Sequence, residues 1–430
     1  MENKKSKSKK PLIGFFPLCY NLAETGRALL VAKEYKKVGG DVIFFSHGGE
    51  YEKIIRKNDF KILSVKPKYS KDFIDDLWKY SRIEKIGAPF SEKQLEEHIE
   101  SEIKAYKKTK VKLIVSTNNF PCVLSARIAK IPLISITPKV RNRFSVFPED
   151  ANLKYTKIIP KKIKLRILNY YFPNSKIWSK PFDDLAKKYK TKRVKNSADL
   201  VKGDYTFYTD FAGMHNIRKN EVRSNEYYIG PIFLDKLFGK TSQKIEIEED
   251  VKKQFKKPGK KILLTLGSSG TKKLFIDIIK KLNKTNYNTI AIYSSILKEN
   301  DLPKTNENIL LKKFVKSIWD INKKVDLVIM HGGQGTVYTA AYSGKPVIGF
   351  PMQLEQHQNL ELLLNKGMAK ILYRKHANEK IFLDAIKDIF ENYSSYYQNA
   401  QNLSKSLHEP KGEINAINQI LKIIKKENIR

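Results

Sequence analysis

The stretch that decides the fold runs from Asp326 to Asn359 and reads DLVIMHGGQGTVYTAAYSGKPVIGFPMQLEQHQN. It opens with an apolar run that ends at Met330, as in a buried strand, and a helix is predicted from about Gln334 to Tyr342. Gly344 suits the left-handed position that ends such a helix, and Pro346 leads into the next apolar run. A strand, a helix and a second strand in this order predict a βαβ unit with a parallel sheet.

The turn inside this unit has the features of a diphosphate site. His331, Gly332 and Gly333 form a tight turn, in which glycines let the backbone approach a ligand closely. The N-terminus of the following helix offers unpaired N–H groups and about half a positive charge. Thr336 can add a hydroxyl donor there, and His331 an imidazole N–H.

Three polar side chains, Glu355, Gln356 and Asn359, follow the second strand. The sequence predicts that they cluster in a polar loop, where they can hydrogen-bond sugar hydroxyls. Each piece alone has an ordinary structural explanation, since a Gly pair usually marks a turn and a Glu-Gln pair in a loop is usually solvated. Joined at this spacing, with strand, helix and strand in the right order, the pieces favour a ligand site.

The same alternation extends through both halves of the chain. Tyr227-Tyr228-Ile229-Gly230-Pro231 is predicted to end the first half as a strand and a turn, and a Lys/Glu-rich segment with a short helix follows. Two successive parallel α/β domains imply a cleft at the carboxyl ends of their strands. We expect an N-terminal domain at 1–240, a linker at 241–258 and a C-terminal domain at 259–430, whose last helix packs back on the N-terminal domain. Strands are predicted at 12–18, 42–46, 62–65, 113–116, 133–136, 262–266, 289–293, 309–311, 326–330 and 347–350, and helices at 23–38 and 413–425.

Composition narrows the class of protein. No apolar run reaches the roughly 20 residues that span a bilayer, and the run at 12–18 is too short for a signal peptide. Only Cys19 and Cys122 occur, in no CxxC pair, so a cytoplasmic enzyme is expected. The net charge of +37 attracts polyanions, but the lysines are spread along the chain and no nucleic-acid-binding motif is present. Nucleic acid is therefore not an expected partner.

An aromatic and basic region lies at 142–190. It either shapes an acceptor site or forms helices packed under the first domain. Together with the net charge, it suggests a peripheral position at the inner face of the cell membrane, where an anionic surface would be the partner and a lipid the acceptor.

The segment from Asp326 to Asn359 resembles the donor-binding signature of inverting glycosyltransferases with the GT-B fold. This group includes UDP-glycosyltransferases, macrolide and sterol glycosyltransferases, and lipid-linked GlcNAc transferases. The resemblance implies an α/β fold with two Rossmann-like domains facing across a cleft. It also implies transfer of a sugar from a nucleotide sugar, as co-substrate, to an acceptor hydroxyl, with no metal and no further cofactor.

The resemblance also implies which residues bind the donor. His331 and the turn after it would contact the diphosphate, and the Glu355-Gln356 pair would hold sugar hydroxyls. The loop after the first strand of the C-terminal domain resembles the family's Gly-Ser loop beside the nucleotide. The implied donor-binding residues are Gly267, Ser268, Ser269, Phe314, Val315, His331, Gly333, Gln334, Gly335, Thr336, Glu355, Gln356 and Asn359.

Two departures from the family pattern concern the segment that recognises the nucleotide base and the residue that acts as catalytic base. The base-reading segment is Phe314-Val315-Lys316-Ser317, so UDP is expected, with dTDP and GDP as alternatives. Many relatives use a His in the first loop, oriented by an Asp after a later strand. Here Glu24 stands near the first position, and Thr117-Asn118-Asn119-Phe120 at the second holds no carboxylate. Glu24 is therefore the candidate catalytic base, or it only stabilises the N-terminus of its helix.

Retaining enzymes of this fold carry a Glu at a position that corresponds to about Thr339 or Ala340 in this chain. Because neither residue is acidic, inversion is expected. Two alternatives stay open. One is a UDP-sugar epimerase on the same scaffold, which would require more acidic and His residues around the cleft. The other is a catalytically degenerate GT-B protein that binds a nucleotide sugar or a polyanion.

Overall fold

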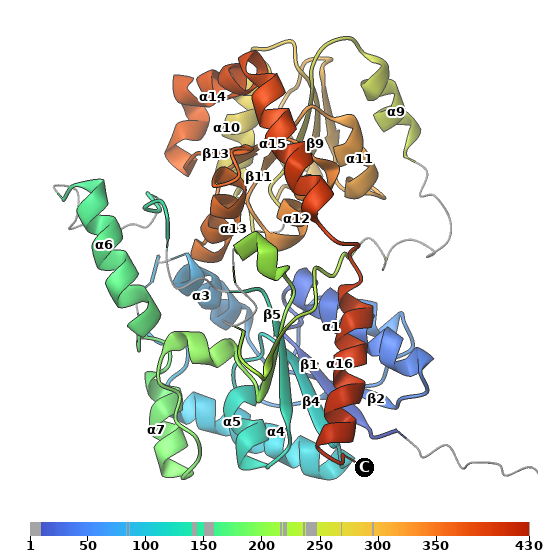
Figure 1. Cartoon of the computed structure of the whole chain (residues 1–430), viewed down its shortest axis with the longest axis vertical. Coiled ribbons are helices and arrows are strands. Elements are labelled where there is room, and N and C mark those ends of the chain that lie inside the picture. Colours follow the sequence, from blue (N-terminus) through green and yellow to red (C-terminus); the bar gives the residue numbers. More distant parts are fainter. Residues whose placement is uncertain are drawn as a thin grey trace, which may run out of the picture.

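The computed structural model describes residues 10–82, 84–85, 87–139, 144–149, 159–215, 217, 222–234, 237, 247–267, 269–294 and 296–429. Two parallel sheets form two domains, of which the N-terminal one lies at the bottom of Figure 1 and the C-terminal one at the top. Apolar clusters lie on both faces of each sheet. This architecture confirms the predicted α/β fold with two Rossmann-like domains.

The N-terminal sheet has the strand order β3-β2-β1-β4-β5-β6-β7, and every pair is parallel. Its central strands are buried along their whole length, as the apolar runs predicted. The elements are β1 (Ile13–Pro17), α1 (Leu22–Lys37), β2 (Val42–Ser46), α2 (Glu52–Arg56), β3 (Ile62–Ser64), α3 (Lys71–Ser81), α4 (Glu92–Thr109), β4 (Leu113–Thr117), α5 (Cys122–Ile128), β5 (Leu133–Thr137), α6 (Lys161–Tyr171), α7 (Lys180–Lys188), β6 (Tyr205–Tyr208) and β7 (Glu226–Tyr228).

The C-terminal sheet has the order β10-β9-β8-β11-β12-β13 and is also parallel throughout. Of the helices, α9 lies in the segment predicted as a linker, and its Val251 is buried in the core of this domain. The elements are α9 (Glu249–Lys256), β8 (Lys261–Thr265), α10 (Lys272–Leu282), β9 (Asn288–Ile292), β10 (Ile309–Lys312), α11 (Ile318–Lys324), β11 (Leu327–Met330), α12 (Gln334–Ser343), β12 (Val347–Gly349), α13 (Leu354–Leu364), β13 (Ala369–Ile371), α14 (Lys380–Glu391), α15 (Tyr393–Ser406) and α16 (Gly412–Lys426).

The last helix, α16, leaves the C-terminal domain and lies beside α1 at the N-terminal sheet (Figure 1). Its residues Ala416, Ile417, Ile420 and Ile423 join the apolar cluster that α1 forms over that sheet. The helical spacing of these residues puts them on one face. The chain thus crosses between the domains twice.

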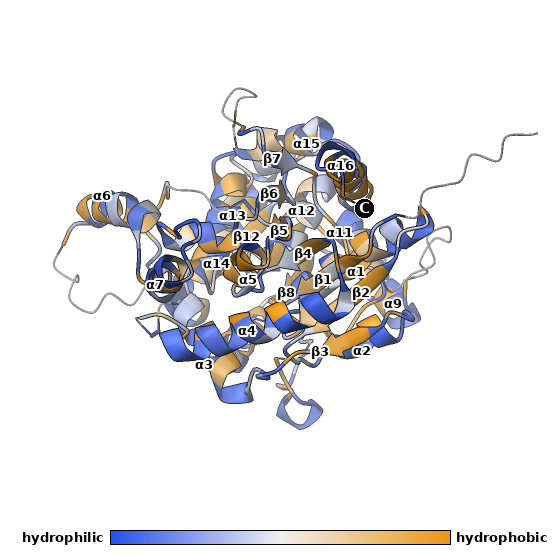
Figure 2. Ribbon diagram, turned by 90° about the horizontal axis from the view of Figure 1, so that it is seen from below, coloured by the Kyte–Doolittle hydropathy of each residue, from blue (hydrophilic) through white to orange (hydrophobic). Residues whose placement is uncertain are grey.

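In the described part of the region at 142–190, two α-helices have different surroundings. Phe182, Leu185 and Ala186 of α7 are buried in the N-terminal core. By contrast, α6 has no buried residue and stands apart from the body of the molecule, with apolar and charged positions interleaved (Figure 2). None of the described helices combines the length and the hydropathy that crossing a bilayer requires.

Candidate active site

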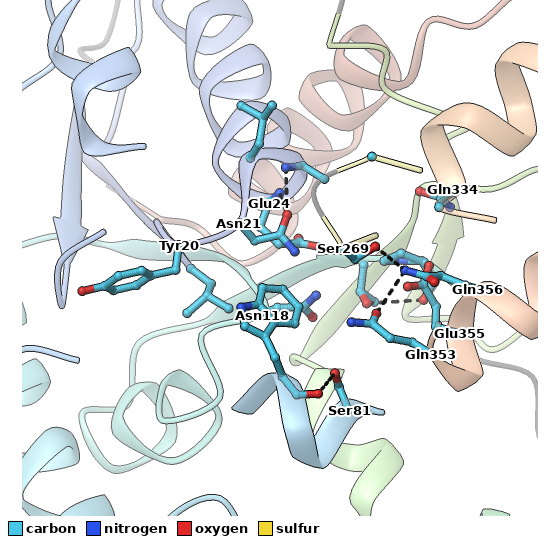
Figure 3. A pocket seen from close by; sticks show the side chains of 18 of the residues that line it. Tyr20, Asn21, Glu24, Ser81, Asn118, Ser269, Gln334, Gln353, Glu355 and Gln356 are labelled. Atoms are coloured by element: carbon cyan, nitrogen blue, oxygen red, sulfur yellow. Dashed lines mark hydrogen bonds between the residues drawn. The ribbon is translucent and has the colours of Figure 1, made fainter. Parts of the chain in front are cut away.

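A cavity of about 480 Å³ lies between the two domains (Figure 3). Residues that directly follow β1, β4, β5 and β11 line it, so it opens at the carboxyl ends of the strands of both sheets. This is where parallel α/β sheets bind their ligands. The C-terminal wall is largely polar and consists of Gly267, Ser269, His331, Gly333, Gln334, Gly335, Thr336, Gln353, Glu355 and Gln356.

The N-terminal wall of the cavity is largely apolar. Its side chains come mainly from the first loop and the start of α1, from α3 and from the segments that precede α5 and α7, with others from the segments after α7 and β7. The apolar and aromatic members are Leu18, Tyr20, Leu22, Ile74, Leu77, Trp78, Phe120, Trp178, Val201 and Leu234. One wall therefore offers hydrogen-bonding groups, and the other offers a surface for an apolar molecule.

The N-terminus of α12 faces this cavity. Gly333 is its N-cap residue and gives no side-chain cap, so the first N–H groups of the helix are available to a ligand. The Thr336 hydroxyl donates to the Gly333 carbonyl at 2.8 Å. A Cβ added at Gly335 would meet no protein atom within 4 Å. The turn thus leaves open space beside a positive helix end, as binding of a diphosphate requires.

His331 is enclosed by the two glycine loops. Gly267 adopts a φ of +58°, and a Cβ on it would come 2.6 Å from the His331 Cε1 atom. A Cβ on Gly333 would come 2.4 Å from Nε2. Both positions therefore require glycine for the imidazole to fit.

Burial lowers the pKa of His331 to about 4, and a backbone hydrogen bond at Thr265 acts weakly in the opposite direction. The imidazole is therefore neutral near pH 7. Its Nδ1 atom is buried and has no hydrogen-bond partner among the described residues. The neutral ring carries one N–H, which can donate to a ligand in the cavity when it does not bond the Thr265 backbone, and the ring brings no buried charge.

Glu355, Gln356 and Asn359 lie on α13, so the predicted polar loop is wrong. The Gln356 Nε2 atom donates to the Ser269 hydroxyl at 2.9 Å, which joins α13 to the Gly-Ser loop. The Asn359 Nδ2 atom donates to Glu355 Oε1 at 2.9 Å and to the Gly332 carbonyl at 3.1 Å. Burial raises the pKa of Glu355. Asn359 does not line the cavity but holds Glu355, which does.

Glu24 lies in the first turn of α1 and lines the cavity. Its Oε1 atom accepts a hydrogen bond from Arg27 Nη1 at 2.8 Å, whereas Oε2 is buried with no partner among the described residues. The Asn21 side chain caps this helix by accepting from the N–H groups of Ala23 and Glu24. The cap is therefore Asn21, which leaves the Glu24 carboxylate for another role.

The chain resembles known glycosyltransferases in sequence and in fold. Residues 250–413 match the family model of the glycosyltransferase family 28 C-terminal domain. A PGL/p-HBAD biosynthesis glycosyltransferase of Mycobacterium tuberculosis (strain H37Ra) is 24% identical over 327 residues, which cover 74% of this chain and 72% of that protein. The protein is a glycosyltransferase with the GT-B fold.

Further relatives agree with this assignment. The UDP-N-acetylglucosamine–N-acetylmuramyl-(pentapeptide) pyrophosphoryl-undecaprenol N-acetylglucosamine transferase of Bacillus cytotoxicus is 26% identical over 181 residues, which cover 39% of this chain and 48% of that protein. The solved structure of the calicheamicin glycosyltransferase CalG4 superposes with a TM-score of 0.66 at 12% identity, covering 97% of this chain and 99% of that one.

Some predicted donor residues of this glycosyltransferase are not described by the structure or do not offer a side chain to the cavity. Ser268 is outside the described residues. Phe314 is exposed and Val315 is buried in the C-terminal core, and neither lines the cavity. The Gln334 side chain turns toward the N-terminal domain, where its Nε2 atom donates to the Thr209 carbonyl at 2.9 Å. Only the backbone of Gln334 is thus available to a donor.

Several residues that line the cavity of the glycosyltransferase could not be recognised in the sequence. Arg27 stands three residues after Glu24, but nothing in its pattern distinguishes it from the many other cations of the chain. Gln353 precedes α13, and its Nε2 atom is buried without a partner among the described residues. Trp78 and Trp178 lie 100 positions apart, so only the fold brings them to one wall.

Proposed function

We propose that this glycosyltransferase moves a sugar from a UDP-sugar to a hydroxyl of an apolar acceptor, with inversion at the anomeric carbon. The observation that carries the proposal is the cavity with one polar and one apolar wall. The helix N-terminus and His331 would hold the diphosphate, and Glu355 and Gln356 the sugar hydroxyls. The apolar wall would seat the acceptor, a lipid or another molecule with an apolar body.

The chemistry is a single displacement. The Oε2 atom of Glu24 would take the proton of the acceptor hydroxyl as its oxygen attacks the anomeric carbon. The bond from that carbon to the diphosphate breaks, and the electron pair leaves with the nucleoside diphosphate. The α12 N-terminus and the neutral imidazole of His331 would stabilise the charge that develops. Thr339 and Ala340 carry no carboxylate at the place where retaining enzymes of the fold have one, which supports inversion.

The nucleotide base is part of the proposal. UDP is supported by the name of the Bacillus cytotoxicus relative, which includes UDP-N-acetylglucosamine. Phe314 lies outside the cavity and gives no reason to prefer another base. dTDP and GDP are the alternatives that a donor panel separates.

The experiment combines binding with turnover. Thermal shifts are measured with UDP, dTDP, GDP and their sugar conjugates, and release of nucleotide is followed with long-chain and aromatic alcohols as acceptors. We expect a shift with a UDP-sugar and transfer to an apolar alcohol. Glu24→Gln should keep the shift and lower kcat by about 10²–10⁴-fold.

Three other results would point elsewhere. A donor-induced shift with no transfer or hydrolysis would favour a degenerate binding protein. Conversion of the UDP-sugar to its epimer would favour an epimerase, although His331 is the only His among the described residues that line the cavity. Full activity of the Glu24→Gln enzyme would exclude Glu24 as the base.

We further propose a peripheral position at an anionic membrane. Helix α6 reads KKIKLRILNYY and contains four basic residues and no acidic one. Ile163, Ile167, Tyr170 and Tyr171 are exposed on it. A basic helix with exposed apolar and aromatic side chains is typical of a segment that lies in the interface of a bilayer.

A further inference from the structure

The Arg27 guanidinium lies between the carboxylate of Glu24 and the N-terminus of α12. Its Nη1 atom donates to Glu24 Oε1 at 2.8 Å, and its Nη2 atom donates to Gln334 Oε1 at 2.9 Å. Gln334 is the first residue of α12, and both Glu24 and Gln334 lie at the cavity in Figure 3. Arg27 belongs to the N-terminal domain, so it reaches across the domain interface to the helix end that faces a diphosphate.

This ion pair is deeply buried. Arg27 is 6% exposed and Glu24 is 4% exposed. A buried ion pair costs desolvation that its attraction barely offsets, so stability alone gives little reason for it. One carboxylate oxygen is fixed by Arg27, while Oε2 has no partner among the described residues although it is buried. A carboxylate held in this way can accept a proton from a molecule in the cavity.

Gln334 fixes the guanidinium on its other side. Its Oε1 atom also accepts from the Thr209 hydroxyl at 2.8 Å, and its Nε2 atom donates to the Thr209 carbonyl. The amide therefore has a single orientation, with its oxygen toward Arg27. Because Thr209 and Arg27 both belong to the N-terminal domain, this geometry exists only while the two domains are in contact.

We propose that Arg27 is the positioning residue that couples the catalytic base to the leaving group. This inference rests on the proposed function, and in particular on Glu24 as the base. Before transfer, the hydrogen bond from Arg27 holds the Glu24 carboxylate aligned. During transfer the acceptor proton moves to Glu24 Oε2, the acceptor oxygen bonds to the anomeric carbon, and the diphosphate departs with the electron pair.

The charges explain how one cation, Arg27, can act on both the catalytic base and the leaving group. Transfer neutralises the carboxylate on one side of Arg27 and adds negative charge to the diphosphate on the other side. Arginine stays protonated throughout, so its attraction passes from the carboxylate to the leaving group without any movement of the cation. A fixed charge aimed at the place where new charge develops stabilises the transition state more than the ground state.

The test compares Arg27→Gln and Arg27→Lys with a matched control. Glu34 and Lys37 form a second i,i+3 ion pair on α1, at the surface of the protein. Lys37→Gln therefore removes a cation from the same helix but away from the cavity. We expect Arg27→Gln to lower kcat on the order of 10²-fold, Arg27→Lys to retain part of the rate, and Lys37→Gln to act as the wild type.

The split between kcat and KM separates this role from a merely structural one. We expect Arg27→Gln to lower kcat while the KM for the UDP-sugar stays near the wild-type value, because the cation acts on charge that develops during transfer. A structural defect would disturb the shape of the cavity, so it would raise the KM for the donor as well as lower kcat. Partial recovery of kcat in Arg27→Lys would show that the charge itself is needed.

The failures are distinguishable. A wild-type kcat in Arg27→Gln, with Glu24→Gln inactive, would overturn the role of Arg27 and leave the proposed function intact. Full activity of Glu24→Gln would overturn the base and this inference with it. A wild-type protein that releases no nucleotide from any donor would overturn both the function and the inference.

Discussion

At the scale of single residues, a substitution at Gly335 is expected to weaken donor binding without lowering the stability of the fold. A Cβ there meets only open space, and alanine in a helix is more stable than glycine by roughly 0.5–1 kcal/mol. We therefore expect Gly335→Ala to unfold at an equal or higher temperature but to lose much of the thermal shift that a UDP-sugar induces, because the methyl group occupies the space for the diphosphate.

Gly333→Ala is the contrasting variant. Its methyl group would collide with the His331 ring, so we expect lower thermal stability as well as weaker binding. If Gly335→Ala bound donors as the wild type does, the diphosphate would not lie against the first turn of α12.

The buried imidazole of His331 predicts a pH-dependent stability. Its pKa is 6.5 in an unfolded chain and about 4 in the fold, so between these values the unfolded state binds more protons. The free energy of unfolding therefore falls as the pH falls from about 6.5 toward 4. Above pH 6.5 the imidazole is neutral in both states, so His331 causes no loss of stability there. We expect this residue to account for a loss of about 2–3 kcal/mol by pH 4.5.

Urea unfolding of the wild type and of His331→Gln at pH 4.5 and 7.5 measures this effect. Burial also lowers the pKa of His98, but that residue is present in both proteins, so its contribution cancels in the comparison. The variant should lose less stability than the wild type as the pH falls. Parallel losses would mean that the imidazole is as easily protonated in the fold as in water.

Much of the polar wall of the cavity could be predicted from the sequence, because strand, glycine turn and helix follow one another within a few residues. His331 and the glycines at 333 and 335 line the cavity, as their spacing led us to expect. Their contacts with a donor stay a prediction. Arg27 and Gln353 could not be found in this way, since their place in the site depends on residues far away in the sequence.

At the scale of elements, α6 gives a direct test of membrane binding. We expect the protein to co-sediment with phosphatidylserine-containing vesicles at low salt, with about 1 kcal/mol from each basic residue near the surface. Replacing both Ile163 and Ile167 by Asp should abolish binding, because charge would enter the apolar face. Ile381 is an exposed isoleucine of α14 in the other domain, so Ile381→Asp is the matched control.

Two results would contradict the membrane proposal. Equal binding of the double variant and the wild type would assign the contact to another surface. Absence of salt-sensitive binding to anionic vesicles in the wild type would remove the proposal altogether.

Helix α13 shows why one element was predicted wrongly. Its sequence LEQHQNLELLL is polar in the first half, which favours a loop on the surface. The fold instead buries these polar groups between the domains, where each finds a partner. His357, for example, forms a hydrogen bond through Nε2 with the Val146 carbonyl at 3.0 Å, in a segment more than 200 residues away. Such partners are invisible in a local pattern.

At the scale of the whole molecule, the apolar runs predicted the central strands of both sheets to within one or two residues at their ends. The strands β6 and β13 have no predicted counterpart. β6 reads YTFY, a short run whose hydroxyls obscure its apolar character, and β13 has only three residues. The contacts that join the domains could not be predicted, because each pairs distant residues, as Tyr338 does when its hydroxyl donates to Asp210 at 3.0 Å.

The return of α16 to the N-terminal domain has a consequence for how such proteins can recombine. The family match ends at residue 413, at the first turn of α16, so this helix lies outside the matched C-terminal unit. Exchanging the C-terminal unit with a relative would therefore take two junctions, one before α9 and one before α16. A chimera joined at the first point alone would give the N-terminal sheet a foreign last helix, and its Ala28 and Leu29 would meet side chains that did not evolve with them.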